Sequence, residues 1–222
     1  MTEVKCHMSK VKRNNMVIYA KEKKERALGE KLFLKAYRCN SAKCAMLRRP
    51  HRPGVHGKAM RRSGSDFGVQ LKAKQKFKLS YGVNESQLKA IFLGASASKG
   101  STAEKIVETL ERRLDNAIFR AGLADSRIMA RHFITRGHFL VNGKRTTSPS
   151  YETGKGDVIA VRPESASKGP FRELVDKLTK FSPPVWLRVD KDKLAAEVTS
   201  LPRDLEPAFD IGAVVEYFSK NN

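Results

Sequence analysis

Residues 101–120 have the sequence STAEKIVETLERRLDNAIFR, which is the pattern of an amphipathic helix. Ser101 is followed three residues later by Glu104, and this pair predicts a helix start because each side chain can bond a free backbone amide of the first turn. One apolar stripe follows at four-residue spacing, formed by Ile106, Leu110, Leu114 and Ile118. The pattern predicts one helix that ends at Gly122.

A second helix is predicted directly after the first one. Asp125 or Ser126 would cap its start, and Gly137 would end it, because glycine tolerates the left-handed backbone of a helix C-terminus. Arg127 and Arg131 are four residues apart and therefore share one face of this helix.

Short strands are predicted to follow the two helices. Phe139–Val141 is rich in β-forming side chains, and Asn142–Gly143 is a strong signal for a two-residue hairpin. The hairpin would carry Lys144 and Arg145, and Val158–Val161 would supply a further strand. The stretch 101–161 is thus expected to form a small unit of helices and antiparallel strands.

The charge of the chain is high and unevenly distributed. Its 222 residues carry a formal net charge of +21. Residues 1–80 hold 22 Lys and Arg against 5 Asp and Glu, whereas residues 81–222 hold 22 against 18. Self-repulsion of this size disfavours a compact monomer, so the expected partner is a polyanion. No long apolar run or lipidation signal supports a membrane surface instead.

The N-terminal part combines a basic arm with a proline-rich loop. Residues 1–28 are basic and weakly periodic, which is typical of a solvated arm. Residues 48–57, RRPHRPGVHG, contain prolines and glycines that disfavour regular structure, together with arginines whose planar guanidinium groups suit phosphate. Three cysteines and no secretory segment indicate a reducing, cytoplasmic compartment without disulfides.

Residues 66–78 carry Lys at every second position from Lys72 to Lys78, a period that would also fit a strand. Good helix formers such as Gln70, Leu71 and Ala73 favour a helix that Tyr81–Gly82 ends. Asn84 or Glu85 would then open another helix through Phe92. Residues 94–100, GASASKG, have the composition of a linker.

Several motifs together resemble the ribosomal protein S-four family of small-subunit ribosomal proteins, bacterial type, between Leu32 and Lys220. In the centre they are RLD (113–115), DSRIMAR (125–131), RGHFLVNGK (136–144) and GDV (156–158). Outside it they are PGVHG (53–57), YGVNESQ (81–87), PVWL (184–187) and VEYFSK (215–220).

The resemblance implies an α+β protein, in which a mainly helical domain with a basic N-terminal arm is interrupted by a small RNA-binding domain of the S-four type. The expected limits are 1–99 for the arm and helical domain, 100–166 for the RNA-binding domain, and 167–222 for the rest of the helical domain. The single Trp186, beside prolines, is expected to be a structural plug.

The implied function is that of a structural constituent of the small ribosomal subunit, located in the cytoplasm. Family members bind small-subunit ribosomal RNA early, at a helical junction of the 5′ domain, and so nucleate assembly. They sit as monomers beside other small-subunit proteins, contribute with protein five to decoding accuracy, and in some bacteria repress their own operon. The alternative is a free-standing translational regulator with the same RNA-binding domain.

Two cationic surfaces are expected to contact RNA mainly through its shape and backbone. The first comprises Arg48, Arg49, Arg52, His56, Arg61 and Arg62, with Lys72 and Lys76 as further candidates. The second comprises Arg113, Arg127, Arg131, Arg136, His138 and Lys144.

Cys39 and Cys44 have a spacing compatible with half of a zinc site. Many members of the family carry a further cysteine pair upstream, where this chain has Glu22 and Glu25. The missing ligands would be Cys6 or His7, or alternatively His51 and His56. The other interpretation is two packed thiols without a metal.

No phosphate-binding glycine loop, nucleophile elbow or paired-histidine zinc helix is present in the sequence. Arg113–Leu114–Asp115 echoes the catalytic motif of pseudouridine synthases, which can carry the same RNA-binding domain. Asp115, however, lies within the basic helix of that domain and is expected to pair with a neighbouring arginine. The chain is therefore expected to bind RNA rather than to catalyse a reaction.

Overall fold

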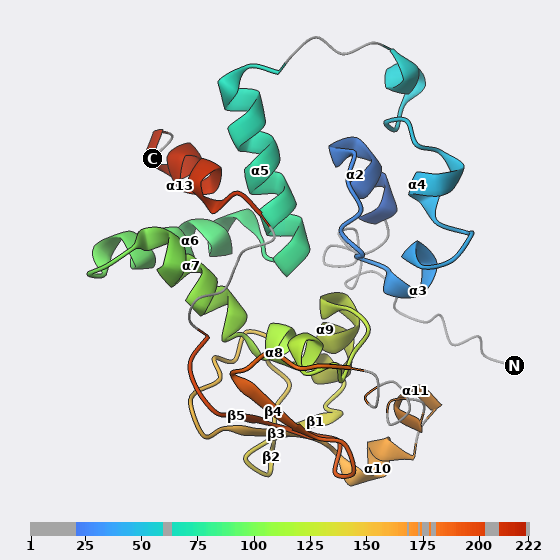
Figure 1. Cartoon of the computed structure of the whole chain (residues 1–222), viewed down its shortest axis with the longest axis vertical. Helices are drawn as coiled ribbons and strands as arrows, with labels where there is room; N and C mark the ends of the chain where they lie inside the picture. Colours follow the sequence, from blue (N-terminus) through green and yellow to red (C-terminus); the bar gives the residue numbers. More distant parts are fainter. Residues whose placement is uncertain are drawn as a thin grey trace, which may run out of the picture. The chain divides into compact units, whose positions relative to one another are not determined.

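The computed structural model describes residues 21–59, 64–167, 169–172, 174, 178, 181–202 and 209–220. The chain divides into two compact units, Met1–Arg62 and Ser63–Asn222, whose elements are labelled in Figure 1. Helices combine with one antiparallel sheet, which confirms the α+β class. Within the ranges given, no helix is both long and apolar enough to cross a membrane.

The first unit contains short helices joined by turns. They are α2 (Lys21–Leu28), α3 (Ala36–Cys39), α4 (Ala45–Arg48) and the 3₁₀ turn η1 (Val55–Lys58). The prediction of a solvated arm over residues 1–28 is wrong for α2, which packs against α4 and buries Glu25; residues 1–20 lie outside the described residues. The turn η1 also corrects the expectation that the proline-rich loop has no regular structure.

The helical part of the second unit consists of α5 (Asp66–Tyr81), α6 (Glu85–Ala97), α7 (Thr102–Glu111) and α13 (Ile211–Lys220). Their shared core includes Phe77, Leu88, Phe92, Leu110 and Phe218. The rings of Phe92 and Phe218 stack at 5.1 Å, which ties the C-terminal helix to α6. The helical interpretation of the lysine-rich stretch is therefore confirmed.

Local signals locate the ends of these helices. The Ser65 hydroxyl accepts the Gly68 amide at the start of α5, and Gly82, with φ +65°, ends that helix in the left-handed region. Gln87 accepts the Asn84 amide at 3.0 Å at the start of α6. The predicted linker 94–100 is wrong in its first half, since α6 continues to Ala97.

The prediction of one helix from Ser101 to Gly122 is also wrong. The chain leaves the helix after Glu111 and starts again as α8 (Leu114–Arg120), because Arg113 is extended at φ −63° and ψ 138°. The amide of Leu114 donates to the Tyr151 carbonyl at 2.8 Å and that of Asp115 to Pro149 at 3.2 Å. The carbonyls of Pro149 and Tyr151 thus accept hydrogen bonds from two amides that would donate within the helix if it were continuous.

The sheet and the helices on it form the rest of the second unit. Its strands are β1 (Phe139–Val141), β2 (Lys144–Arg145), β3 (Val158–Val161), β4 (Leu187–Asp190) and β5 (Ala195–Val198). They are antiparallel in the order β2-β1-β3-β5-β4. The other helices are α9 (Arg127–Thr135), α10 (Pro163–Ala166) and α11 (Gly169–Arg172).

Most predictions for this region are confirmed. Ser126 caps α9, whose end is followed by Gly137 at φ +72°. Asn142 and Gly143 both have positive φ, 50° and 76°, and join β1 to β2 as the predicted hairpin. Trp186 is buried in the core of the sheet.

The C-terminal segment contributes to two cores. Trp186, Leu187, Leu194, Ala196 and Val198 pack in the core of the sheet, together with Phe139 and Phe171. Ile211, Val214 and Phe218 pack instead in the core of the helical part. The domain limits 1–99, 100–166 and 167–222 stay a prediction, and any division must account for both contributions.

Candidate nucleic-acid interface

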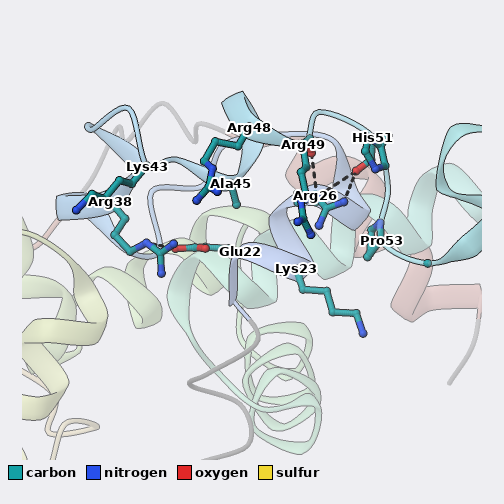
Figure 2. A pocket seen from close by; sticks show the side chains of 11 residues that line it. Glu22, Lys23, Arg26, Arg38, Lys43, Ala45, Arg48, Arg49, His51 and Pro53 are labelled. Atoms are coloured by element: carbon teal, nitrogen blue, oxygen red, sulfur yellow. Dashed lines mark hydrogen bonds and ion pairs between the residues drawn. The ribbon is translucent and has the colours of Figure 1, made fainter.

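Arg26 of α2 holds the proline-rich loop of the first unit, residues 48–57, in place. Arg26 Nε donates to the Arg49 carbonyl and Nη2 to the His51 carbonyl, both at 2.9 Å, as Figure 2 shows. These bonds hold the backbone of the loop without using its side chains. Arg48, Arg49 and His56 are exposed and Arg52 is half-buried. The candidates Arg61 and Arg62 lie outside the described residues.

A cavity of about 650 Å³ lies beside this loop (Figure 2). Arg48 and Arg49 line it, as do four cations that sequence reasoning does not single out as binding candidates, namely Lys23, Arg26, Arg38 and Lys43. No local signal in the sequence brings these residues together. They meet because α2 packs against α4 and the loop.

The two described cysteines lie in a buried region organised by Glu25, which is 1% exposed. Glu25 Oε1 accepts the amides of Leu32 and Leu34, both at 3.1 Å, and Oε2 lies 3.9 Å from Cys39 Sγ. Burial raises the pKa of the Cys39 thiol, and the Glu25 charge adds to this rise. A raised thiol pKa opposes the thiolate that a metal needs.

The zinc hypothesis therefore depends on residues beyond this region. Cys39 and Cys44 are both buried free thiols. Among the residues with described positions, no three His, Cys, Asp or Glu side chains gather as metal ligands. Cys6 and His7 lie outside those residues, so zinc binding at Cys39 and Cys44 stays a prediction that needs one of them.

In the second unit, the lysines of α5 divide into two pairs. Lys74 and Lys78 both hold Glu85, each at 2.6 Å from one of its carboxylate oxygens. Burial alone would raise the pKa of Glu85, but the two lysines lower it. Lys72 and Lys76 are half-buried and take no part in this bridge. They keep their place among the RNA-binding candidates.

Arg113 and Arg131 of the second predicted surface both bind Asp115. Arg113 is 8% exposed and donates twice to the Asp115 carboxylate, at 3.2 and 3.0 Å. Arg131 donates to the same carboxylate and also to the Gly82 carbonyl. A side chain at Gly82 would meet the Arg131 guanidinium at 3.3 Å, so glycine allows this approach as well as the positive φ. Arg131 thus connects α8 and α9 to the end of α5.

A second buried carboxylate, Glu111, binds Arg120 and Tyr81. Arg120 donates twice to Glu111, at 2.9 Å each, and Tyr81 donates its hydroxyl at 2.7 Å. Asn116 adds a bond of 2.6 Å. Burial alone would raise the pKa of Glu111, but the bonds from Arg120, Tyr81 and Asn116 lower it. Burial raises the pKa of Tyr81, and the Glu111 charge raises it further.

Arg127 lies against this group. Its Nε donates to Asn116 Oδ1 at 2.6 Å, and its guanidinium sits 4.7 Å from the ring centroids of Tyr81 and Phe119. Burial lowers the pKa of Arg127, yet an arginine remains charged in this environment. Arg127 therefore has internal partners, as Arg113 and Arg131 do.

The other three candidates lie around the hairpin. Arg136 and Lys144 are exposed. His138 is half-buried, with Nδ1 2.9 Å from the Ser165 hydroxyl and its ring against Phe171. Arg145 of β2 lies directly over Gly137, where a Cβ would come within 2.2 Å of its Nε. This contact places the Arg145 guanidinium over Gly137, the residue that follows Arg136 in the sequence.

The arginines and lysines predicted for the second surface, together with Arg145, thus fall into an internally paired and an exposed set. Arg113, Arg127 and Arg131 bind groups on other helices or at helix ends, whereas Arg136, Lys144 and Arg145 face solvent. A phosphate backbone can reach the exposed set directly. The internally paired set fixes the helices next to which the exposed cations lie.

Comparison with known proteins gives consistent matches along most of the chain. Residues 17–111 match the family model described as the ribosomal protein S4/S9 N-terminal domain, and residues 112–159 match the S4 domain. The chain is 44% identical over 197 residues to small ribosomal subunit protein uS4 of Gloeobacter violaceus, covering 88% of this chain and 94% of that protein. It is 45% identical over 193 residues to the protein of the same name from Desulfotalea psychrophila, covering 86% and 92%.

Proposed function

The chain belongs to the uS4 family of small ribosomal subunit proteins, and we therefore propose that it is a structural constituent of the small ribosomal subunit that binds ribosomal RNA directly. The observation that carries this proposal is the extent of the similarity. It covers more than nine-tenths of the length of the two relatives described above. A protein that shares only the small RNA-binding domain would match over that domain alone.

The charges of the described residues support direct contact with RNA. Arg48, Arg49 and His56 are exposed on the first unit, and Arg136 and Lys144 on the second. Cations that neutralise phosphates release counterions, so the affinity for RNA should fall steeply as salt rises. Contacts of this kind position a protein on folded RNA without reading its sequence.

The finer parts of the proposal rest on the resemblance to the family. The protein would bind early, at a helical junction of the 5′ domain, and would nucleate assembly there. It would act as a monomer in the ribosome, in the cytoplasm, beside small-subunit protein five, and would contribute with it to decoding accuracy. In this role the protein binds and does not catalyse.

The position of Asp115 supports binding over pseudouridine chemistry. Its side chain is 1% exposed and is held by Arg113 and Arg131. A nucleophile must contact the base that it attacks. In this arrangement, the Asp115 carboxylate is enclosed by two guanidinium groups, as expected for an internal ion pair.

Sedimentation of a cell lysate tests the proposed role. A tagged chain is expected to migrate with small subunits through a sucrose gradient and to stay with them after a high-salt wash. A free-standing regulator would remain near the top of the gradient, or would leave the subunits in the wash. That second result would overturn the proposal.

A further inference from the structure

The cavity of the first unit, lined by parts of α2, the turn after α3, α4 and the loop, has a strongly cationic wall (Figure 2). Its volume of about 650 Å³ lies within the range of ligand sites, roughly 300–1,000 Å³. Six basic side chains line it, namely Lys23, Arg26, Arg38, Lys43, Arg48 and Arg49. Glu22 is the one carboxylate among the described residues of the lining.

Two of these six cations have structural partners. Arg26 binds the carbonyls of the loop, as described above. Arg38 Nε lies 3.0 Å from Glu22 Oε1, and this ion pair neutralises the carboxylate. The pair also keeps Glu22 from competing for the remaining cations. The positive charge of the wall is therefore not cancelled from within.

The charged groups of the other four cations are not paired with another side chain of the described residues. Within the described ranges, no side-chain partner is present for Lys23, Lys43, Arg48 or Arg49. Four cations around one hollow repel one another unless an anion lies between them. A single phosphate would contact only part of such a wall, whereas closely spaced phosphates could contact several sides of it.

The backbone of the loop that carries Arg49 is held in place within the protein. Arg26 binds the Arg49 and His51 carbonyls, and the proline ring fixes the φ angle of Pro53. A loop whose backbone is already held loses less entropy on binding. Three of the described lining residues, Ala45, Pro53 and Gly54, have no polar side chain.

The lining also indicates which part of a nucleotide is recognised. Among the described residues that line the cavity, His51 has the one aromatic ring, whereas six side chains carry a positive charge. Bases in unpaired RNA are usually held by stacking on aromatic rings. We propose that this cavity binds closely spaced phosphate groups, such as an RNA backbone presents at a sharp turn. This inference rests on the proposed RNA-binding function for the source of the phosphates, and a free oligophosphate is the other source.

Calorimetric titration of the full chain with inorganic triphosphate tests the site independently of RNA. The wild-type protein is expected to bind triphosphate about tenfold more tightly than orthophosphate, because several cations act together. The double variant K43Q/R48Q should lose about tenfold in triphosphate affinity. The control K31Q/K58Q removes the same charge from exposed residues outside the lining, and should change affinity less than about twofold.

Competition with a small-subunit ribosomal RNA fragment distinguishes the two sources. If triphosphate displaces the RNA from the wild-type chain but not from K43Q/R48Q, the cavity holds RNA backbone. If triphosphate binds without displacing RNA, the site takes a free oligophosphate. The proposed site would be disproved if K43Q/R48Q and K31Q/K58Q lost equal triphosphate affinity. It would also be disproved if the wild-type chain bound triphosphate no more tightly than orthophosphate. Failure of the wild-type chain to bind the RNA would instead count against the proposed function, because the triphosphate titration still reports on the cavity.

Discussion

Arginines of the first unit and arginines of the helix pair α8–α9 are used in different ways. Around the loop, Arg26 binds backbone carbonyls and leaves Arg48 and Arg49 with free charged ends. Between α8 and α9, Arg113 and Arg131 are both taken up by Asp115. A high density of arginine therefore does not by itself mark a binding surface. The deciding factor is whether a buried carboxylate lies within reach of the guanidinium groups.

The largest effect is expected when the buried carboxylate of α7 is removed. Glu111→Ala should lower the free energy of unfolding by about 3–5 kcal/mol, because Arg120 loses its partner and Tyr81 and Asn116 lose an acceptor. Urea denaturation measures this change. Glu108→Ala on the same helix is the control, since Glu108 makes only a surface pair with Lys105 and should change the free energy by less than about 1 kcal/mol. Similar losses in both variants would contradict the distinction.

A smaller effect is expected for the arginine that connects α9 to the end of α5. Arg131→Gln should lower the free energy of unfolding by about 1–3 kcal/mol, because Asp115 and the Gly82 carbonyl lose a donor. Arg136→Gln, at an exposed position, should stay within about 0.5 kcal/mol and weaken RNA binding instead. Urea denaturation and RNA titration of both variants check this. If Arg131→Gln unfolds like the wild type but weakens RNA binding more, Arg131 belongs to the interface.

The same comparison predicts a pH dependence of stability. Burial raises and hydrogen bonding lowers the pKa of Glu111, and the net direction is downward from its ordinary value of 4.5. A carboxylate with a lowered folded-state pKa contributes stability above its unfolded pKa and loses it as pH falls. The urea midpoint of the wild type should therefore drop below about pH 4.5. Glu111→Gln, which cannot ionise, should show a shallower drop, and an equal drop would exclude Glu111 as a source.

The smallest effect is expected on α5. Lys72→Gln should leave stability unchanged and should lower the slope of log affinity against log salt by about 0.7–0.9, the loss of one phosphate contact. Lys78→Gln breaks a bridge to Glu85 and should cost less than about 1 kcal/mol, with no change in the salt slope. Filter binding over a range of salt concentrations measures both slopes. A change of slope for Lys78→Gln alone would reverse the assignment of the two lysines.

Sequence reasoning succeeds here where the cause is local. Ser126 and the pair Asn142–Gly143 act within a few residues of themselves, and the structure has the predicted cap and hairpin there. The break at Arg113 could not be predicted in this way. It depends on carbonyls of residues 149 and 151, almost forty positions further along the chain. A helical pattern on both sides of Arg113 gives no sign of that competition.

The candidate site was predictable to a similar extent. The cationic loop is visible in the sequence because its arginines and prolines are adjacent. The cavity is not visible, since Lys23, Lys43 and Arg48 come from three segments that only packing brings together. Pairing of Asp115 with a nearby arginine follows from the sequence, and the structure confirms it with Arg113. The contacts of Arg131 with Asp115 and with the Gly82 carbonyl can be seen only in the folded structure.

The bonds from Arg26 to the loop also bear on how the protein forms during synthesis. A helix of eight residues such as α2 has little stability of its own in water, and a chain leaves the ribosome with its N-terminus first. The guanidinium of Arg26 is made more than twenty residues before the carbonyls that it binds. The bonds from Arg26 to the loop can therefore form only after His51 has emerged, whereas those from the Leu32 and Leu34 amides to Glu25 can form earlier.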